Sequence, residues 1–147
     1  MRLWILAIVL AAVVVTSAVY LRSRPSAPSA GTAAGQSAVG CGAVERDYAQ
    51  HRSGVWVTLD AAVERLLPDE YGRLRHQRFI VRCADGQTIL IVNDVSIGTR
   101  APVSIGGMVG VRGQYVWNRL GGLIHFTHHN DSGGQGGWVL WRGRVYS

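Results

Sequence analysis

The chain opens with nineteen residues, 3–21, that carry no charge and few polar side chains. A helix rises ~1.5 Å per residue, so a helix of this length spans a bilayer core of ~30 Å. The apolar region of a cleaved secretory signal is shorter, about 7–15 residues. We therefore expect residues 1–23 to be a transmembrane anchor or signal, with an uncleaved anchor favoured. The membrane is then a partner through residues 3–21.

Residues 24–40 change to Pro, Ser, Ala and Gly with a single charge. Such a composition cannot bury a core and predicts a flexible linker. Apolar residues at helical offsets then predict a short helix over residues 41–51. The folded domain is expected over residues 41–147. Its two cysteines, Cys41 and Cys83, are open to two interpretations, a disulfide or a pair of free thiols.

The clearest pattern of alternating apolar and polar residues lies at 76–94, around Asp85-Gly86. Asp-Gly between two β-rich runs predicts a hairpin with a two-residue loop, and the loop length sets the register of the strands. In that register Val81 pairs with Leu90. The core face then comprises Phe79, Val81, Cys83, Leu90 and Val92. The outer face comprises His76, Arg78, Ile80, Arg82 and Asn93.

Other β-rich segments surround this hairpin. Residues 55–67 are too long for a straight strand and predict a bent one, and the composition of residues 67–72 predicts a turn. Further strands are expected at 109–117 and 123–129, with a short closing hairpin about Arg142-Gly143. This pattern predicts a mainly β fold, a small five-stranded OB-like barrel preceded by the N-terminal transmembrane helix and the short helix. A β-sandwich-like roll is the alternative.

In the later strands, alternation predicts which side chains face the core. Tyr115 and Trp117 are expected to face inwards together with Ile124 and Phe126. The outward side chains are then expected to be Arg112, Gln114, Val116, His125, Thr127 and His129.

Charge changes this picture only locally. All 15 basic residues are arginine and the formal net charge is +6, but three arginines flank the apolar opening segment. From residue 40 onwards the chain has twelve arginines and nine acidic residues, a net charge of +3. That value is too small to indicate a general nucleic-acid-binding protein. A basic stripe remains, formed by Arg73, Arg75, Arg78 and Arg82.

Candidate chemistry centres on HFTHHN, residues 125–130, which holds three of the five histidines. Zinc takes three or four N, S or O ligands. His125 and His129 would lie ~13 Å apart along a straight strand, too far to share a metal. His76, His125 and His128 form a better set, both as metal ligands and as catalytic acid–base residues. We expect either no cofactor or one divalent transition metal such as zinc.

Histidines near a strand end also bond backbone groups or carboxylates without any further role, and His129 is assigned to that class. No nucleophile elbow and no phosphate-binding glycine loop before a helix is present in the sequence.

Four motifs together resemble a bacterial family of exported proteins that is known only as a domain of unknown function. They are PDEYGRLRHQRFIV, GQYVWN, GGLIHFTHHN and GGWVLWRGRVY, and they cover roughly residues 54–146. The resemblance implies a shared fold and no established activity. The family pattern maps onto His76, Gln77 and Phe79, then Tyr115, Trp117 and Asn118, then His125, Thr127 and His128.

Two departures from the family pattern weaken a metal site. Family members often have His-Asn where this chain has Asn93-Asp94, and a further His where it has Gln135.

The register and the family motifs select the same outer surface. The ligand-binding candidates are His76, Gln77, Arg78, Asn93, Asp94, His125, Thr127, His128 and Trp138. We expect a membrane-tethered binding module of the cell envelope for an anionic or polar ligand, of the oligonucleotide or glycan type. The alternative is a hydrolase, metal-assisted in one version, that uses His76, His125 and His128. The expected location is the bacterial inner membrane, single-pass, with the folded domain in the periplasm or outside the cell and with no clear protein partner.

Overall fold

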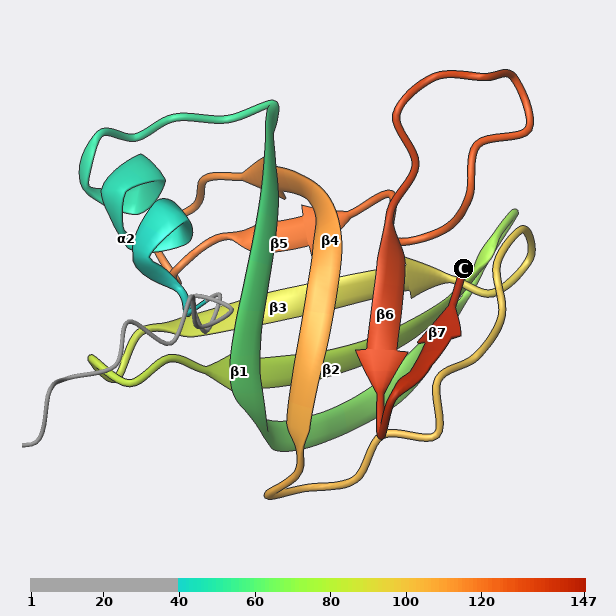
Figure 1. The fold of residues 1–147 in the computed structure, drawn as a ribbon, viewed down its shortest axis with the longest axis horizontal. Helices are drawn as coiled ribbons and strands as arrows, with labels where there is room; N and C mark the ends of the chain where they lie inside the picture. Colours follow the sequence, from blue (N-terminus) through green and yellow to red (C-terminus); the bar gives the residue numbers. More distant parts are fainter. Residues whose placement is uncertain (1–39) are drawn as a thin grey trace, which may run out of the picture. The chain divides into compact units, whose positions relative to one another are not determined.

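The computed structural model describes residues 40–147 as one short helix followed by seven strands (Figure 1). The elements are α2 Gly42–Ala49, β1 Val55–Tyr71, β2 Arg75–Arg82, β3 Thr88–Asp94, β4 Met108–Val116, β5 Leu123–His125, β6 Trp138–Trp141 and β7 Arg144–Tyr146. The mainly β prediction and the predicted short helix are confirmed. The predicted anchor over 1–23, and the linker over 24–40 except Gly40, lie outside the described residues. Within residues 40–147 no helix is long and apolar enough to cross a membrane.

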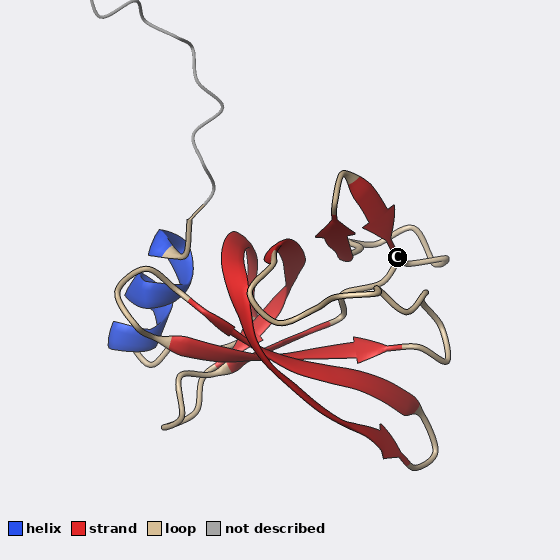
Figure 2. Cartoon of the chain, turned by 90° about the horizontal axis from the view of Figure 1, so that it is seen from below, coloured by secondary structure: helices blue, strands red, loops and turns tan. Residues whose placement is uncertain are grey.

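Five of the strands form a closed ring. Their order is β1-β2-β3-β5-β4, and β4 pairs with β1 to close it. β3 and β5 run parallel to each other, whereas the remaining pairs are antiparallel. β6 pairs with β4 outside the ring, and β7 pairs with β6. In both ribbon views α2 and the β6–β7 hairpin lie on opposite sides of the ring (Figures 1 and 2).

The length of β1 allows the ring to close. Its first half pairs with β4 and its second half with β2, and the register shifts twice, between Val63 and Arg65 and between Leu67 and Glu70. Such bulges bend a strand and increase its twist. The predicted bent strand is confirmed, but the turn predicted at 67–72 is wrong. Pro68 lies within the second bulge, where it need not donate a ladder hydrogen bond, and the strand continues to Tyr71.

The β2–β3 hairpin has a loop of three residues rather than two. The amide of Gly86 donates to the carbonyl of Cys83, and Gly86 has φ of +95°. A turn followed by a residue in the left-handed region is the usual three-residue hairpin loop, and glycine adopts it without steric cost. Val81 therefore pairs with Ile89.

This one-residue shift moves every side chain of β3 to the opposite face. Ile89, Ile91 and Asn93 are fully buried, whereas Leu90 and Val92 lie on the half-exposed face with His76 and Arg78. The predicted core positions of Leu90 and Val92 and the predicted outer position of Asn93 are wrong. The predicted core positions of Phe79 and Val81 on β2, and of Cys83 directly after it, are confirmed.

β5 is shorter than predicted because the chain leaves the strand at Phe126. This residue has φ of +53°, which takes the backbone out of the extended region. Ile124 pairs with Tyr115 and both are fully buried, as predicted. Beyond the bend the inside–outside alternation inverts. Thr127 is fully buried and Phe126 is 47% exposed, so both predicted orientations are wrong.

The helix α2 is held against the ring by covalent and apolar contacts. Cys41 at its start forms a disulfide with Cys83 at the end of β2, which decides between the two interpretations of the cysteines. Val44 is fully buried in the core, and the ring of Tyr48 stacks on Trp117. Because Cys83 precedes the β2–β3 loop, the disulfide joins the helix to that hairpin.

A candidate histidine pocket

Three histidines from separate positions of the chain line one cavity of about 270 Å³. His76 comes from β2, His125 from β5 and His128 from the loop after it. The remaining lining residues are Asp94, Leu74, Val92, Ile97 and Phe126. We call this cavity the histidine pocket. It brings together four of the nine predicted ligand-binding residues, including all three candidate catalytic histidines.

His76 and Asp94 lie opposite each other in the β2–β3 register. The Nε2 atom of His76 is 4.0 Å from Oδ2 of Asp94, and Oδ1 of Asp94 accepts a hydrogen bond of 2.8 Å from the amide of Ser96. Asp94 as a whole is 7% exposed. The other ring nitrogen of His76, Nδ1, is buried and has no hydrogen-bond partner. The protein therefore leaves hydrogen-bonding capacity unused at this imidazole.

Phe126 packs between the other two histidines. Its ring stacks on His125 with 4.0 Å between centroids and meets His128 edge-on at 6.2 Å. Positive φ is rare for a bulky residue, and backbone strain of this kind is concentrated at functional sites. Phe126 is also half exposed, so burial of its side chain does not explain the strain.

The polar contacts of His125 and His128 show which ring nitrogen of each carries a proton. Nε2 of His125 lies 3.2 Å from Oε1 of Gln114, and Nδ1 of His128 lies 2.7 Å from the carbonyl oxygen of His129. Because these oxygens only accept, the two nitrogens donate. Burial, and then the electrostatic influence of the neighbouring His128, lower the pKa of His125. The pocket therefore favours a neutral imidazole at His125 near neutral pH.

The three histidines are not arranged as a ready metal site. Among residues 40–147, one set of three metal-binding side chains has donor atoms within 4.8 Å of one another, and it consists of Cys41, Glu45 and Cys83. Both sulfur atoms of that set are in the disulfide. A metal in the histidine pocket would require the imidazoles to rotate towards a common point.

Three further predicted residues, Gln77, Asn93 and Thr127, lie behind the pocket in the protein interior. The Thr127 hydroxyl donates to Oδ1 of Asn93 at 3.0 Å, and Nδ2 of Asn93 donates to Oε1 of Gln77 at 3.2 Å. Gln77 also makes two hydrogen bonds to the backbone of Ala101. We call these three side chains the buried amide network. Each is the chain neighbour of a pocket residue, so the network holds the pocket from behind.

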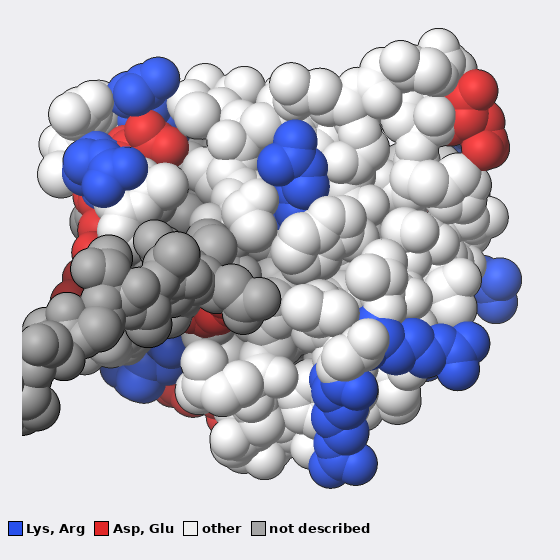
Figure 3. All heavy atoms as spheres, in the orientation of Figure 1, with Lys and Arg blue, Asp and Glu red and all other residues white. Residues whose placement is uncertain are grey.

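Two of the four arginines of the predicted basic stripe, Arg78 and Arg82, are engaged by other groups. Arg78 donates twice to the carbonyl of Pro68 and lies 3.8 Å from Glu70. Arg82 pairs with Glu64 at 2.8 Å. β1 supplies both acids, which a pattern read along β2 alone does not reveal. In Figure 3 the basic side chains of the displayed face lie beside acidic ones at the upper left, singly near the middle and in a group at the lower right, so they form no continuous stripe on this face.

Trp138 lies on β6, outside the histidine pocket. It is half-buried and pairs with Arg112 across the β4–β6 ladder. It is therefore not brought together with the histidines.

A second cavity, of about 280 Å³, shares Phe126 and His128 with the histidine pocket. Its other lining residues are Trp56, Gln114, Asn130 and Gln135. None of these four is among the nine predicted ligand-binding residues. Trp56 and Gln114 lie opposite each other on β1 and β4. Asn130 and Gln135 lie in the glycine-rich loop between β5 and β6. The only hint of this cavity in the sequence was the composition of that loop, in which an asparagine and a glutamine are surrounded by glycines.

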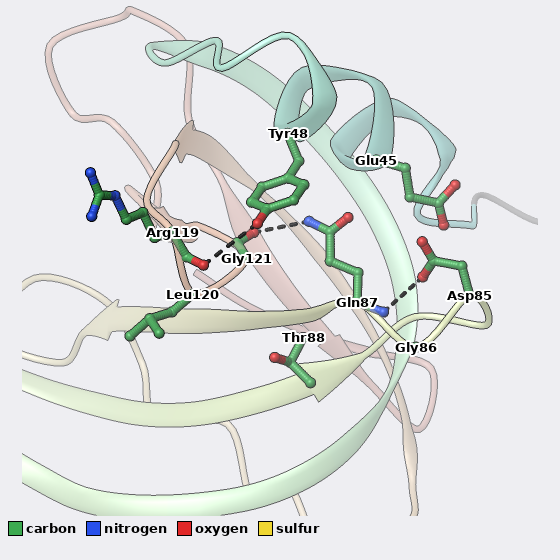
Figure 4. A pocket seen from close by; sticks show the side chains of 9 residues that line it. All are labelled: Glu45, Tyr48, Asp85, Gly86, Gln87, Thr88, Arg119, Leu120 and Gly121. Carbon is green, nitrogen blue, oxygen red and sulfur yellow. Dashed lines mark hydrogen bonds between the residues drawn. The ribbon is translucent and has the colours of Figure 1, made fainter.

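A third and larger cavity, about 470 Å³, lies between α2, the β2–β3 loop and residues 119–121 (Figure 4). Its polar groups mostly bond one another. The side-chain amide of Gln87 donates to the Gly121 carbonyl at 2.9 Å, and Asp85 accepts from the Gln87 backbone amide. It contains no histidine and no buried unpaired donor or acceptor among its described lining residues. The histidine pocket is therefore the stronger candidate site.

These features define a small mainly β domain with a ring of five strands, a disulfide-linked helix and a pocket of histidines. Residues 33–147 match the family described as "Protein of unknown function (DUF3465)", and the chain belongs to that family. The resemblance to a domain of unknown function is thus confirmed. No curated protein matches the chain.

Proposed function

We propose that the domain is a binding module of the bacterial cell envelope, tethered to the membrane by the N-terminal segment, whose ligand occupies the histidine pocket. The single observation that carries this proposal is the convergence of His76, His125 and His128 around one cavity. We further propose that the five-strand ring is an OB-like barrel. Its strand order, with β1 shared between β2 and β4, supports this assignment, and such barrels bind oligonucleotides and oligosaccharides.

The chemistry of the pocket favours binding over catalysis. Its polar groups are three imidazoles and one carboxylate, and its remaining surface is aliphatic or aromatic. Ligand sites typically combine an apolar lining with a few placed polar groups. The nearby hydroxyl of Thr127 is buried and donates to Asn93, so it is not available as a nucleophile.

The disulfide supports the proposed location. Disulfides persist in oxidising compartments such as the periplasm and the cell exterior. A domain carried there by an apolar N-terminal segment would retain the Cys41–Cys83 bond.

A thermal-unfolding screen tests the proposed binding function. The full chain would be heated with small phosphates, nucleotides, monosaccharides and oligosaccharides in turn. We expect at least one compound to raise the Tm of the wild type, since a ligand at a hundred times its Kd adds about 2.7 kcal/mol of stability. The same compound should not raise the Tm of His76→Ala or His128→Ala.

His129→Ala is the matched control for this screen. His129 is exposed and pairs with Asp131 at 3.1 Å, and it does not line the pocket. Its variant should respond like the wild type. Equal stabilisation of the pocket variants, or no stabilising compound at all, would refute the proposed site.

A second candidate function is hydrolysis, with or without a bound transition metal. The observation that favours it is the His76–Asp94 pair, because a carboxylate beside an imidazole can orient a general base. The test is the metal content of the purified full chain by mass spectrometry. About one equivalent of zinc or another transition metal, lost in His125→Ala, would favour the hydrolase. Absence of metal after incubation with zinc and desalting would exclude its metal-assisted form.

A further inference from the structure

The histidine pocket and the second cavity share two lining side chains, Phe126 and His128. We call the second cavity the amide pocket, since three of its lining residues carry side-chain amides: Gln114, Asn130 and Gln135. Each cavity alone is slightly smaller than the ~300–1,000 Å³ typical of small-molecule sites. Their combined volume falls within that range, and the exposed ring of Phe126 lines both of them, so the two cavities can act as one groove.

We propose that this groove is a two-subsite oligosaccharide-binding site in which one sugar unit lies in the histidine pocket and the next in the amide pocket, on the two sides of Phe126. This inference rests on the proposed binding function and names its ligand class.

The groove matches the chemistry of a sugar. Hydroxyl groups both donate and accept hydrogen bonds, and so do side-chain amides and neutral imidazoles. The apolar C–H face of a pyranose packs on an aromatic ring, and the groove offers Phe126 and, in the amide pocket, Trp56. Trp56 is oriented by Arg112, whose guanidinium lies 5.7 Å from its ring centroid.

The same groove is poorly suited to an oligonucleotide. Phosphate backbones are bound mainly through arginine and lysine. The described lining residues of the two pockets include neither arginine nor lysine. Arg78 and Arg82 are paired with Glu70 and Glu64. Arg112, beside Trp56, donates to the Gly136 carbonyl and to the Thr58 hydroxyl. The buried carboxylate of Asp94 adds a negative charge to the histidine pocket, which opposes a phosphate further.

The strain at Phe126 supports its central role. A residue with φ of +53° would normally be Gly, Asn or Asp, yet this position holds a large aromatic side chain that is 47% exposed. The bend directs the ring out of the core to the boundary between the two pockets, where the alternation of a straight strand would not place it.

The test is calorimetric titration of the full chain, kept in a detergent that contains no sugar, with tetramers of glucose, N-acetylglucosamine and galacturonate and with each monosaccharide. Labelled oligothymidine is the comparison. We expect at least one tetramer to bind about tenfold or more tightly than its own monosaccharide, a difference of ~1.4 kcal/mol. Oligothymidine should bind no tighter than the non-specific range of about 10⁻⁴–10⁻⁶ M.

Variants assign the two subsites. Gln135→Ala and Trp56→Ala should weaken the tetramer about fivefold or more and leave the monosaccharide unchanged, whereas His76→Ala should weaken both. Gln135 is exposed, so its variant remains informative where Trp56→Ala fails to fold. Leu120→Ala is the matched control, because this side chain is 85% exposed and lines the cavity beside α2 instead.

The outcomes separate this inference from the proposed function. Equal affinity for monomer and tetramer, with no effect of Gln135→Ala, would leave a single histidine pocket and overturn the groove. Tight oligothymidine binding that is lost in His76→Ala, without glycan binding, would overturn the ligand class while the pocket stands. Loss of glycan binding in Leu120→Ala alone would move the site to the other cavity. No binding of any probe here or in the thermal screen would overturn both.

Discussion

The polar residues around the histidine pocket fall into two layers that alternate along the chain. His76, Asp94 and His128 line the cavity, while their neighbours Gln77, Asn93 and Thr127 form the buried amide network. A buried polar group is tolerated when it is hydrogen-bonded, and each member of the network has a partner. The network therefore fixes the backbone positions from which the pocket side chains project.

Thr127→Val tests the network. The change keeps the shape of the side chain but removes the hydroxyl that donates to Asn93, so a buried acceptor loses this partner. We expect the free energy of unfolding to fall by about 1–3 kcal/mol in urea titrations. The control is Thr99→Val, an exposed position where the loss should stay within about 0.5 kcal/mol. Equal losses in both variants would contradict the assigned role.

The lowered pKa of His125 predicts that acid destabilises the domain. The unfolded chain protonates this residue at its ordinary value of 6.5, while the folded chain resists protonation because of burial and then His128. Stability is thus fully present above the unfolded pKa and declines as the pH falls from there towards the lower folded pKa. Urea unfolding of wild type and His125→Gln at several pH values measures this. The variant should lose less stability on acidification, and an identical pH dependence would count against the prediction.

At the scale of elements, the disulfide is the main constraint on α2. Cys41 and Cys83 are 42 residues apart in the sequence, and the bond joins the helix to the β2–β3 hairpin. The helix has eight residues, fewer than an isolated helix needs for stability in water. Its position therefore depends on this bond and on the burial of Val44.

Removing the disulfide should destabilise the domain. In the chain-entropy description, a loop of this length is worth about 4 kcal/mol, and measured values are commonly about 2–4 kcal/mol. We expect the Cys41→Ser, Cys83→Ser double variant to lose stability in that range. A dithiol reductant should shift the urea midpoint of the wild type and leave that of the double variant unchanged. Reaction of both cysteines with a thiol reagent in unreduced, unfolded protein would show that the bond is absent.

At the scale of the whole molecule, closure of the ring determines which charges meet. β1 bends across from β4 to β2 and brings Glu64 and Glu70 beside arginines of β2. Surface ion pairs of this kind add little stability, about 0–1 kcal/mol each. Their effect is to reduce the positive potential that a stripe of unpaired arginines would have.

The Arg78→Ala, Arg82→Ala double variant tests this balance. Because these side chains bond to β1 and line neither pocket, we expect glycan affinity to stay within about twofold at low and high salt. A ligand held through phosphate contacts would instead show log Kd changing with log salt by about 0.7 per contact on a single strand. A clear loss of affinity that high salt abolishes would restore the basic-face hypothesis.

The sequence by itself determined the elements whose signal is local. Alternation and the Asp-Gly turn located β2, β3 and β4, the apolar offsets located α2, and the length of residues 55–67 required a bend. The motif pattern selected the family and His76, His125 and His128. Each element, and each motif taken singly, depends on residues close together in the chain.

Only the tertiary structure decided the features that arise where distant segments meet. A loop of three residues instead of two shifted the register and took Asn93 inside, and the bend at Phe126 turned Thr127 inward. Neither change alters the local composition, so the apolar pattern could not reveal it. Acids on β1 came to pair with Arg78 and Arg82 of β2, and Phe126 and His128 came to line two cavities. Ring closure decides these contacts, because it brings together side chains that are far apart in the sequence.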